Sequence, residues 1–288
     1  MDLDSARHAF VTGGASGIGR GIAEALVDAG VRVTIADIDR EAAEAAVAAR
    51  PGDLAGLELD VRDRRAWRDA KTRSEALFGP VDILVNNAGI GFNGRDFADL
   101  DPEVFDRIID IDLTGVFNGI STFAADLRAR GRGHIVNTAS VMALTAGAPG
   151  RGAYSAAKSA VVAMSEALRQ EMAPHGVGVS VLCPGLVRSN LDSTTTRLGG
   201  QVENVAHIKG DGRLGMDPAE AGARVVHGIA RDLPYILTHP HYLSHVDARM
   251  NALRRSFAEA AEFEEVPCVV PAVRPPQRHT GSGAARRQ

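Results

Sequence analysis

Tyr154 and Lys158 are the two side chains whose types and spacing indicate chemistry most directly. Positions four apart share one face of a helix, so the phenol and the ammonium would project into one site. A free phenol has a pKa of about 10, too high for a base near neutrality, and a nearby cation lowers that value by favouring the phenolate. The pair therefore predicts proton transfer. A solvated helix face with the same spacing by chance is the alternative.

Ser140 and a glycine-rich turn extend this pattern. Ser140 lies just after the predicted strand His134–Asn137, which could bring its hydroxyl beside Tyr154. The run Thr12-Gly13-Gly14-Ala15-Ser16-Gly17-Ile18-Gly19 follows the apolar residues 9–11 and opens a helical pattern. Glycines allow a tight turn close to a pyrophosphate, and the following helix directs N–H groups and a favourable dipole at it. An ordinary glycine-rich turn between strand and helix is the alternative.

Acidic and amide residues follow three further strands. Asp37, about 20 residues after the glycine turn, could accept both ribose hydroxyls of an adenosine and would repel a 2′-phosphate, which favours NAD over NADP. Its alternative role is to cap the helix that begins near Asp39. Asp60 and Val61 could flank the adenine. The segment Asn86-Asn87-Ala88-Gly89 lets a cofactor approach the backbone, unless it is only a turn.

Strands and helices alternate along the chain, which predicts an α/β fold with one doubly wound parallel sheet of about seven strands flanked by helices. The predicted strands are Ala9–Thr12, Arg32–Ala36, Gly56–Leu59, Ile83–Val85, His134–Asn137, Gly178–Leu182 and Tyr235–Leu237. The predicted helices are Gly17–Ala29, Arg40–Ala49, Asp63–Phe78, Pro102–Ala129, Gly152–Met172, Pro218–Arg231 and His241–Glu262. Residues 1–265 form one predicted domain with a substrate loop at 186–215, and residues 266–288 form a Pro/Gly/Arg-rich tail.

Composition narrows the class of protein. The 288 residues are 45% hydrophobic and 24% charged, with a net charge of −4, so no basic face for nucleic acid or anionic lipid is expected. No uninterrupted apolar stretch approaches the roughly 18–20 residues of a membrane span. The two cysteines, Cys183 and Cys268, fit a reducing compartment, and we expect a cytoplasmic protein.

The motifs resemble the short-chain dehydrogenase/reductase family in its shorter, non-extended form with a Rossmann-type sheet. The resemblance rests on the glycine turn with its spacing, Asp60, Asn86–Gly89, Ser140, Tyr154, Lys158 and Pro184-Gly185, in family order over most of residues 8–240. It implies that Tyr154 is the general acid/base, that Lys158 holds the nicotinamide ribose and lowers the tyrosine's pKa, and that Ser140 binds the substrate oxygen. Pro184, Gly185 and Val187 would meet the nicotinamide end, and Ser189 its carboxamide.

Asp112 departs from the family pattern, which usually has asparagine there. In the family, the main-chain carbonyl of this residue helps to hold a water joined to the lysine. That backbone role could survive, so Asp112 is included with the catalytic residues. A buried carboxylate needs compensation or takes up a proton, however.

An NAD-dependent oxidoreductase that interconverts a secondary alcohol and a ketone is the function we expect. The substrate is predicted to be hydrophobic or aromatic because the residues expected around it are mostly apolar: Val141, Met142, Leu144, Pro149, Leu186, Leu191 and Leu198. The loop 186–215 is predicted to be a mobile lid over the substrate, and a plain surface loop is the alternative. An NADPH-preferring biosynthetic ketoreductase and a non-catalytic NAD-binding sensor are the alternatives.

Two further expectations concern binding partners. The helix 152–172 carries small and apolar residues on more than one face, which predicts a homotetramer or homodimer. His239, His241 and His245 have a spacing that can bind zinc, but no acidic or cysteine partner accompanies them, so no metal site is predicted.

Overall fold

The computed structural model describes residues 1, 3–91, 94–145, 147–198 and 215–262. By its internal contacts the chain divides into Met1–Arg249 and Met250–Gln288. The boundary between them falls within helix α10 (Leu243–Ala261). The boundary predicted after residue 265 and the tail 266–288 lie outside the described residues.

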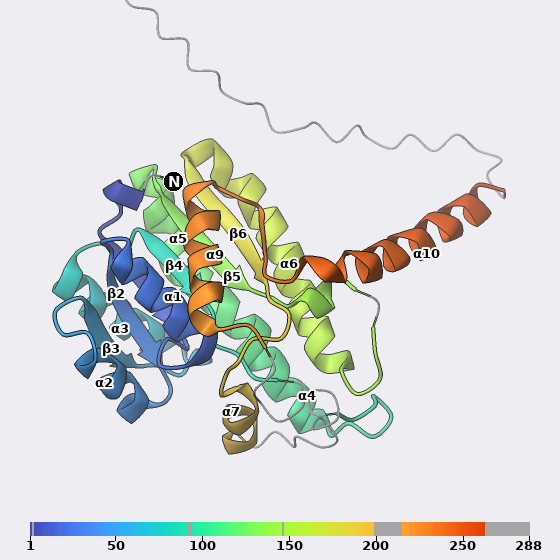
Figure 1. The fold of residues 1–288 in the computed structure, drawn as a ribbon, viewed down its shortest axis with the longest axis horizontal. Coiled ribbons are helices and arrows are strands. Elements are labelled where there is room, and N and C mark those ends of the chain that lie inside the picture. Colours follow the sequence, from blue (N-terminus) through green and yellow to red (C-terminus); the bar gives the residue numbers. More distant parts are fainter. Residues whose placement is uncertain (2, 92–93, 146, 199–214, 263–288) are drawn as a thin grey trace, which may run out of the picture. The chain divides into compact units, whose positions relative to one another are not determined.

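Seven parallel strands form one sheet in the order β3-β2-β1-β4-β5-β6-β7, which confirms the predicted fold (Figure 1). The strands are β1 His8–Thr12, β2 Arg32–Asp37, β3 Leu54–Glu58, β4 Ile83–Asn86, β5 Gly133–Thr138, β6 Val177–Cys183 and β7 Tyr235–Leu237. The central strands β1, β4 and β5 are buried at every position, as expected where helices cover both faces of a parallel sheet. Their sequences have short apolar centres, such as Ile135-Val136 in β5, with buried polar residues at their ends.

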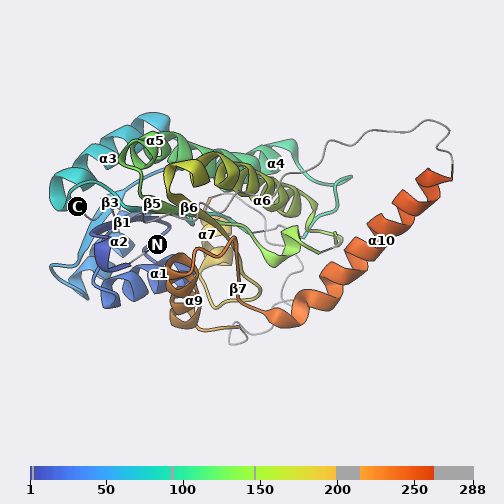
Figure 2. The ribbon, with the colours of Figure 1, turned by 90° about the horizontal axis from the view of Figure 1, so that it is seen from above.

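Helices lie on both faces of the sheet (Figure 2). On one face, α1, α2 and α9 pack onto Val11 and Ile35, mainly through Ile22, Leu26 and Val225. On the other face, a second apolar cluster joins the sheet to α3, α5 and α6. The helices of the first face are α1 Gly17–Asp28, α2 Arg40–Ala48 and α9 Pro218–Ala230, and those of the second are α3 Arg64–Phe78, α4 Pro102–Ile109, α5 Gly115–Arg130 and α6 Gly152–Met172.

Trp67 belongs to the second cluster. It is fully buried, and its ring lies 5.8 Å from that of Phe10 and 6.3 Å from that of Phe123. Its indole N–H donates to the carbonyl oxygen of Val61 at 2.9 Å, so the one polar atom of the side chain is satisfied. The contact ties the loop after β3 to the core of the protein.

The single helix predicted over Pro102–Ala129 is interrupted in the structure. A wide π-type turn, η2 (Asp110–Thr114), separates α4 from α5. Such turns add a residue to the helical repeat and often occur at functional sites. Here the turn brings Asp112 into the interior, where its side chain has no exposed surface.

A short helix that sequence periodicity did not reveal, α7 (Leu191–Arg197), lies in the predicted substrate loop. The loop is also tied back at its base. Val187 pairs with Met216 in a parallel bridge, and the Met216 N–H donates to the carbonyl oxygen of Leu186 at 2.9 Å. Residues 199–214 of the predicted lid lie outside the described residues.

The helical run over residues 102–130 is long and apolar enough to cross a membrane by length and composition alone. Half of its most apolar window is buried inside the protein. Its segments pack against α3, α6 and β4, as a core helix of this fold does.

Candidate active site

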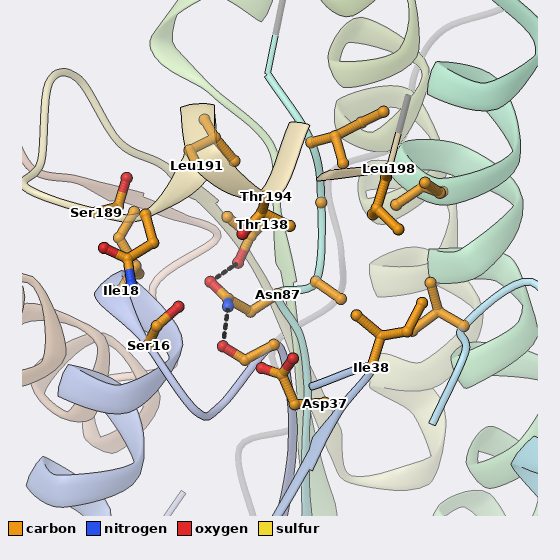
Figure 3. A pocket seen from close by; sticks show the side chains of 18 of the residues that line it. Ser16, Ile18, Asp37, Ile38, Asn87, Thr138, Ser189, Leu191, Thr194 and Leu198 are labelled. Atoms are coloured by element: carbon orange, nitrogen blue, oxygen red, sulfur yellow. Dashed lines mark hydrogen bonds between the residues drawn. The ribbon is translucent and has the colours of Figure 1, made fainter. Parts of the chain in front are cut away.

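A cavity that is partly open to solvent lies at the carboxyl ends of the strands. The strand order reverses between β1 and β4, and such a switch point is where ligands bind in open α/β sheets. Figure 3 shows the cavity between the glycine turn, the end of β2 and helix α7. The predicted site residues that line it are Gly13, Ser16, Gly17, Ile18, Asp37, Asp60, Val61, Asn87, Ala88, Gly89, Tyr154, Lys158, Pro184, Ser189 and Leu191.

The glycine turn is packed too closely for side chains. Gly13 has a φ of +61°, and a Cβ there would lie 2.9 Å from the Cα of Ala88. A Cβ at Gly19 would lie 2.1 Å from the carbonyl oxygen of Gly13. Gly19 itself does not line the cavity but supports the residues that do.

The first turn of α1 faces the cavity without a side-chain cap. Ser16 occupies the N-cap position and makes no capping hydrogen bond with its side chain. The first N–H groups of a helix have no intrahelical partner and attract anions. Ser16 and Ile18 are both directed toward the cavity (Figure 3).

Thr12 and Asn87 fix the cavity floor, and the sequence analysis gave Thr12 no role. The Thr12 hydroxyl accepts hydrogen bonds from the backbone N–H groups of Asn87 and Ala88, at 2.9 and 3.0 Å. The Asn87 amide nitrogen donates to the carbonyl oxygen of Thr12 at 3.1 Å. The Asn87 amide oxygen accepts from the Thr138 hydroxyl at 3.4 Å (Figure 3). β1, β4 and β5 are thereby joined through side chains at their ends.

Two roles were considered for Asp37, binding an adenosine ribose and capping helix α2, and the structure gives the second role to Asp39. One carboxylate oxygen of Asp37 accepts from the Ala15 N–H at 3.1 Å, and the other accepts from the Asp39 N–H at 3.0 Å. The N-cap of α2 is Asp39, which accepts from Ala42. Asp37 is therefore not the cap, and its carboxylate faces the cavity.

Asp60 lies at the same end of the cavity and carries a partner that the sequence did not suggest. Arg62 holds its carboxylate through Nε at 3.0 Å and through Nη2 at 2.6 Å. Hydrogen bonding from Arg62 lowers the pKa of Asp60. Both side chains line the cavity, so this end presents an ion pair next to Val61.

Ser140, Tyr154 and Lys158 meet at the opposite end. The hydroxyl groups of Ser140 and Tyr154 are hydrogen-bonded to each other. The Lys158 ammonium lies 5.6 Å from the centroid of the Tyr154 ring and donates to the carbonyl oxygen of Thr138 at 3.2 Å. Lys158 is 3% exposed, so this cation lies within the protein rather than on a solvated helix face.

Tyr154 differs from expectation in the direction of its pKa. Lys158 was expected to lower the pKa of the phenol, but the pKa lies above its ordinary value of 10. Burial is the largest cause, the Asp112 carboxylate adds to it, and the hydrogen bond to Ser140 opposes it. The expectation considered the cation and neither the burial nor the neighbouring anion, which both raise the pKa of the phenol.

Asp112 is that anion. Its Oδ1 accepts from the Ile90 N–H at 2.8 Å, and its Oδ2 lies 3.8 Å from the Lys158 ammonium. Burial raises the pKa of Asp112 to about 6, although the Lys158 charge and the Ile90 N–H both act to lower it. Asp112 does not line the cavity and lies behind Gly89 and Lys158.

Helix α7 forms the wall of the cavity opposite the sheet. Leu191, Thr194 and Leu198 face the interior (Figure 3). The Thr195 hydroxyl accepts from the Gly91 N–H at 2.7 Å, and Arg197 pairs with Asp39 at 2.8 Å. The helix is thus held at two points.

The remaining predicted site residues lie near the cavity but do not line it: Ser140, Met142, Gly185, Leu186 and Val187. Ser140 caps a short 3₁₀ turn, η3 (Val141–Ala143), by accepting from the Met142 N–H at 3.2 Å. The Gly185 N–H donates to the Thr238 hydroxyl at 3.0 Å. Gly185, Leu186 and Val187 lie between β6 and α7, at the base of the loop that leads to α7.

Within the described part of the chain, no three His, Cys, Asp or Glu side chains are grouped so as to hold a metal ion. His239, His241 and Tyr242 instead pack ring against ring, with the two imidazole centroids 5.5 Å apart.

The sheet, the cavity at its switch point and the Ser140–Tyr154–Lys158 group define a Rossmann-like oxidoreductase, and the chain belongs to the short-chain dehydrogenase/reductase family. The family model described as short chain dehydrogenase matches residues 7–197. This confirms the family resemblance drawn from the motifs.

Three relatives illustrate the similarity. The chain is 35% identical over 265 residues to the C alpha-dehydrogenase of Sphingobium sp. strain SYK-6, covering 87% of this chain and 86% of that protein. It is 39% identical over 186 residues to a 2,5-dichloro-2,5-cyclohexadiene-1,4-diol dehydrogenase of Sphingobium indicum, and the match covers 64% of this chain and 74% of that protein. A short-chain dehydrogenase/reductase from Burkholderia phymatum, solved in complex with NAD, superposes with a TM-score of 0.79 at 28% identity, covering 94% and 100%.

The cavity fits a nicotinamide dinucleotide, the cofactor class of this family. Glycines stand where a Cβ would collide with backbone, the first turn of α1 is open, and carboxylates lie at one end. A dinucleotide would extend from Asp37 and Asp60 to Tyr154 and Lys158, with its phosphates at residues 16–18.

Proposed function

We propose that this protein is an NAD-dependent oxidoreductase that interconverts a secondary alcohol and a ketone. The observation that carries the proposal is the hydrogen-bonded pair of Ser140 and Tyr154 beside the Lys158 ammonium, at the inner end of the cavity. Tyr154 moves the proton at its Oη to or from the substrate oxygen, Ser140 orients that oxygen, and Lys158 holds the ribose. When bound, the nicotinamide supplies or accepts the hydride.

Asp37 supports NAD as the cofactor. Its carboxylate lies at the end of β2, where it can accept ribose hydroxyls and repels a 2′-phosphate. The Burkholderia phymatum relative was solved with NAD. An NADPH-preferring ketoreductase is disfavoured by the same carboxylate.

The walls of the cavity support a hydrophobic or aromatic substrate. Leu191 and Leu198 of the α7 region and Ile90 after β4 present apolar surface. The two relatives from Sphingobium are named for a Cα position and for a chlorinated cyclohexadiene diol. We propose an aryl or alicyclic secondary alcohol rather than a sugar.

Steady-state turnover with a panel of aryl and alicyclic alcohols and ketones tests this function. We expect a clearly higher kcat/KM with NAD than with NADP, and Asp37→Ala should narrow the gap. Equal or better kcat/KM with NADP would overturn the cofactor proposal. Cofactor binding without turnover of any substrate would favour a non-catalytic sensor.

Glu58→Gln is the matched control for Asp37→Ala. Glu58 is the register partner of Asp37 on the neighbouring strand β3, and it does not line the cavity. The exchange removes one negative charge nearby while leaving the ribose site intact. It should keep the NAD preference, which separates direct contact from general electrostatics.

We further propose that the protein acts in the cytoplasm as a homotetramer or homodimer. On α6, Ala156, Ala163 and Ala167 are exposed, and on the neighbouring α5 the side chain of Phe117 is 48% exposed. Small side chains allow two copies of a helix to approach closely in a self-complementary interface. Light scattering at micromolar concentration should give at least a dimer, and a monomer would refute this.

A further inference from the structure

Asp112 has a position that the proposed reaction does not explain. It is fully buried, and its Oδ2 has no hydrogen-bond partner among the described residues. That oxygen lies 3.8 Å from the Lys158 ammonium, which is 5.6 Å from the centroid of the Tyr154 ring. A Cβ at Gly89 would lie 2.9 Å from Asp112 Oδ1 and 3.3 Å from Lys158 Nζ, so glycine there leaves room for both charged groups.

Among the described residues, few charges act on Tyr154. The titratable groups that face it are Asp112 from η2, Lys158 from α6 and the thiol of Cys183 from β6. The fourth neighbour, the Ser140 hydroxyl after β5, is neutral. The carboxylate and the ammonium are both buried, so each acts on the phenol through an interior that screens charge less than water does.

We propose that the ionised Asp112 offsets the charge of Lys158 and keeps Tyr154 a protonated phenol at neutral pH, so that the site favours ketone reduction there. Asp112 is then a positioning residue, which acts on the reaction only through Lys158 and Tyr154. This inference rests on the proposed function and assigns it a preferred direction near neutrality.

The direction follows from where the proton must be before the reaction. In reduction, the Tyr154 O–H bond breaks and a new O–H bond forms on the substrate oxygen, while the carbonyl carbon accepts a hydride. In oxidation, Tyr154 must already be a phenolate to take the proton. A negative charge near the phenol disfavours the phenolate, and the raised pKa of Tyr154 agrees with this. At neutral pH the Tyr154 phenol, which donates the proton in reduction, is therefore present, whereas the phenolate that oxidation needs is a minor species.

Ultraviolet titration of phenolate tests the proposal without turnover or cofactor. The chain has three tyrosines, so the Tyr154 component is the difference between a protein and its Tyr154→Phe counterpart. In Asp112→Asn, the Tyr154 ionisation should begin about one to two pH units lower than in the wild type, the size expected for one close charge. An unchanged onset would overturn the proposal. Asp112→Ser provides the same neutral comparison if Asp112→Asn does not fold.

Asp82→Asn is the matched control. Asp82 is also buried, at 1% exposure, but it precedes β4 and does not line the cavity. Its exchange should leave the Tyr154 onset where it is. An equal shift in both variants would indicate general loosening of the protein and would overturn the proposal.

The pH profiles of kcat in both directions provide the kinetic readout. In Asp112→Asn, the alkaline rise of the oxidation rate should move to lower pH by about the same one to two pH units. Oxidation at pH 7 should then be faster by about 10-fold or more. Unmoved profiles would overturn the inference, whereas wild-type protein without any turnover would overturn the proposed function alone.

Discussion

Asp82 and Asp112 are two buried carboxylates near opposite ends of β4. Asp82 precedes the strand, accepts from the Arg7 N–H at 2.9 Å, and lies 3.4 and 3.7 Å from the guanidinium groups of Arg132 and Arg130. Asp112 packs against the segment after the strand, where it has one N–H donor and one ammonium, that of Lys158.

The difference lies in the cations. The Arg132 side chain is 55% exposed, so water shares the charge around Asp82, whereas the Lys158 side chain is 4% exposed. Water screens the interactions of a partly exposed charge, whereas a buried charge interacts strongly with the groups around it. Equal burial of two carboxylates therefore has different consequences: at the amino end it supports the fold, and at the carboxyl end it sets the reactivity of a phenol.

The largest expected effect comes from Tyr154→Phe at the carboxyl end. Loss of the hydroxyl removes proton transfer, which contributes a factor of about 10²–10⁴ to the rate. Cofactor binding, measured by titration calorimetry, should remain. Asp82→Asn should keep kcat within about 2-fold, since removing a charge far from the reacting atoms leaves the proton path intact. A comparable loss of kcat in Asp82→Asn would break the comparison.

The next largest effect is expected in the pH dependence of stability, through Asp112. The folded pKa of Asp112, about 6, lies above its ordinary value of 3.8, so its stabilising contribution is present below pH 3.8 and is lost as pH rises through 6. Between pH 4 and 7, the free energy of unfolding of the wild type should fall relative to that of Asp112→Asn by on the order of 2–3 kcal/mol. Urea melts at several pH values measure this, and parallel curves would contradict it.

A smaller effect is expected from Gly19→Ala in the glycine turn. The added Cβ would lie 2.1 Å from the carbonyl oxygen of Gly13, so the turn must move. Overpacking of about 1–3 kcal/mol corresponds to about 5–150-fold weaker cofactor binding. Gly147→Ala is the control, because a Cβ there has no heavy atom within 4 Å and should leave binding unchanged.

The smallest effect is expected from Asp82→Asn on stability. The exchange keeps the shape of the side chain and leaves two arginines that can turn toward water. We expect a loss of about 1–2 kcal/mol in the free energy of unfolding, measured by chemical denaturation. A loss above about 4 kcal/mol would mean that the Asp82 cluster is as isolated from water as the Asp112 pair.

The sequence predicted the sheet and the positions of its main helices because short β-rich segments alternate with longer segments of helical periodicity. It also identified Ser140, Tyr154 and Lys158, whose spacing reflects one strand and one helix. Helix α7 was found only in the structure, because residues 191–197 have little apolar periodicity. The π-type turn was also found only there, because no sequence pattern indicates such a turn. The direction of the Tyr154 pKa could not be predicted because Asp112 reaches Lys158 only through that turn.

Trp67 gives the molecule an intrinsic optical probe. It is the one tryptophan in the chain, and its indole N–H is bonded to the carbonyl oxygen of Val61, a residue that lines the adenine end of the proposed cofactor site. Fluorescence excited in the indole band therefore arises from a single place, adjacent to that end. Ligand binding can be followed by the emission of the unmodified protein, and an adenosine fragment alone should suffice to change it.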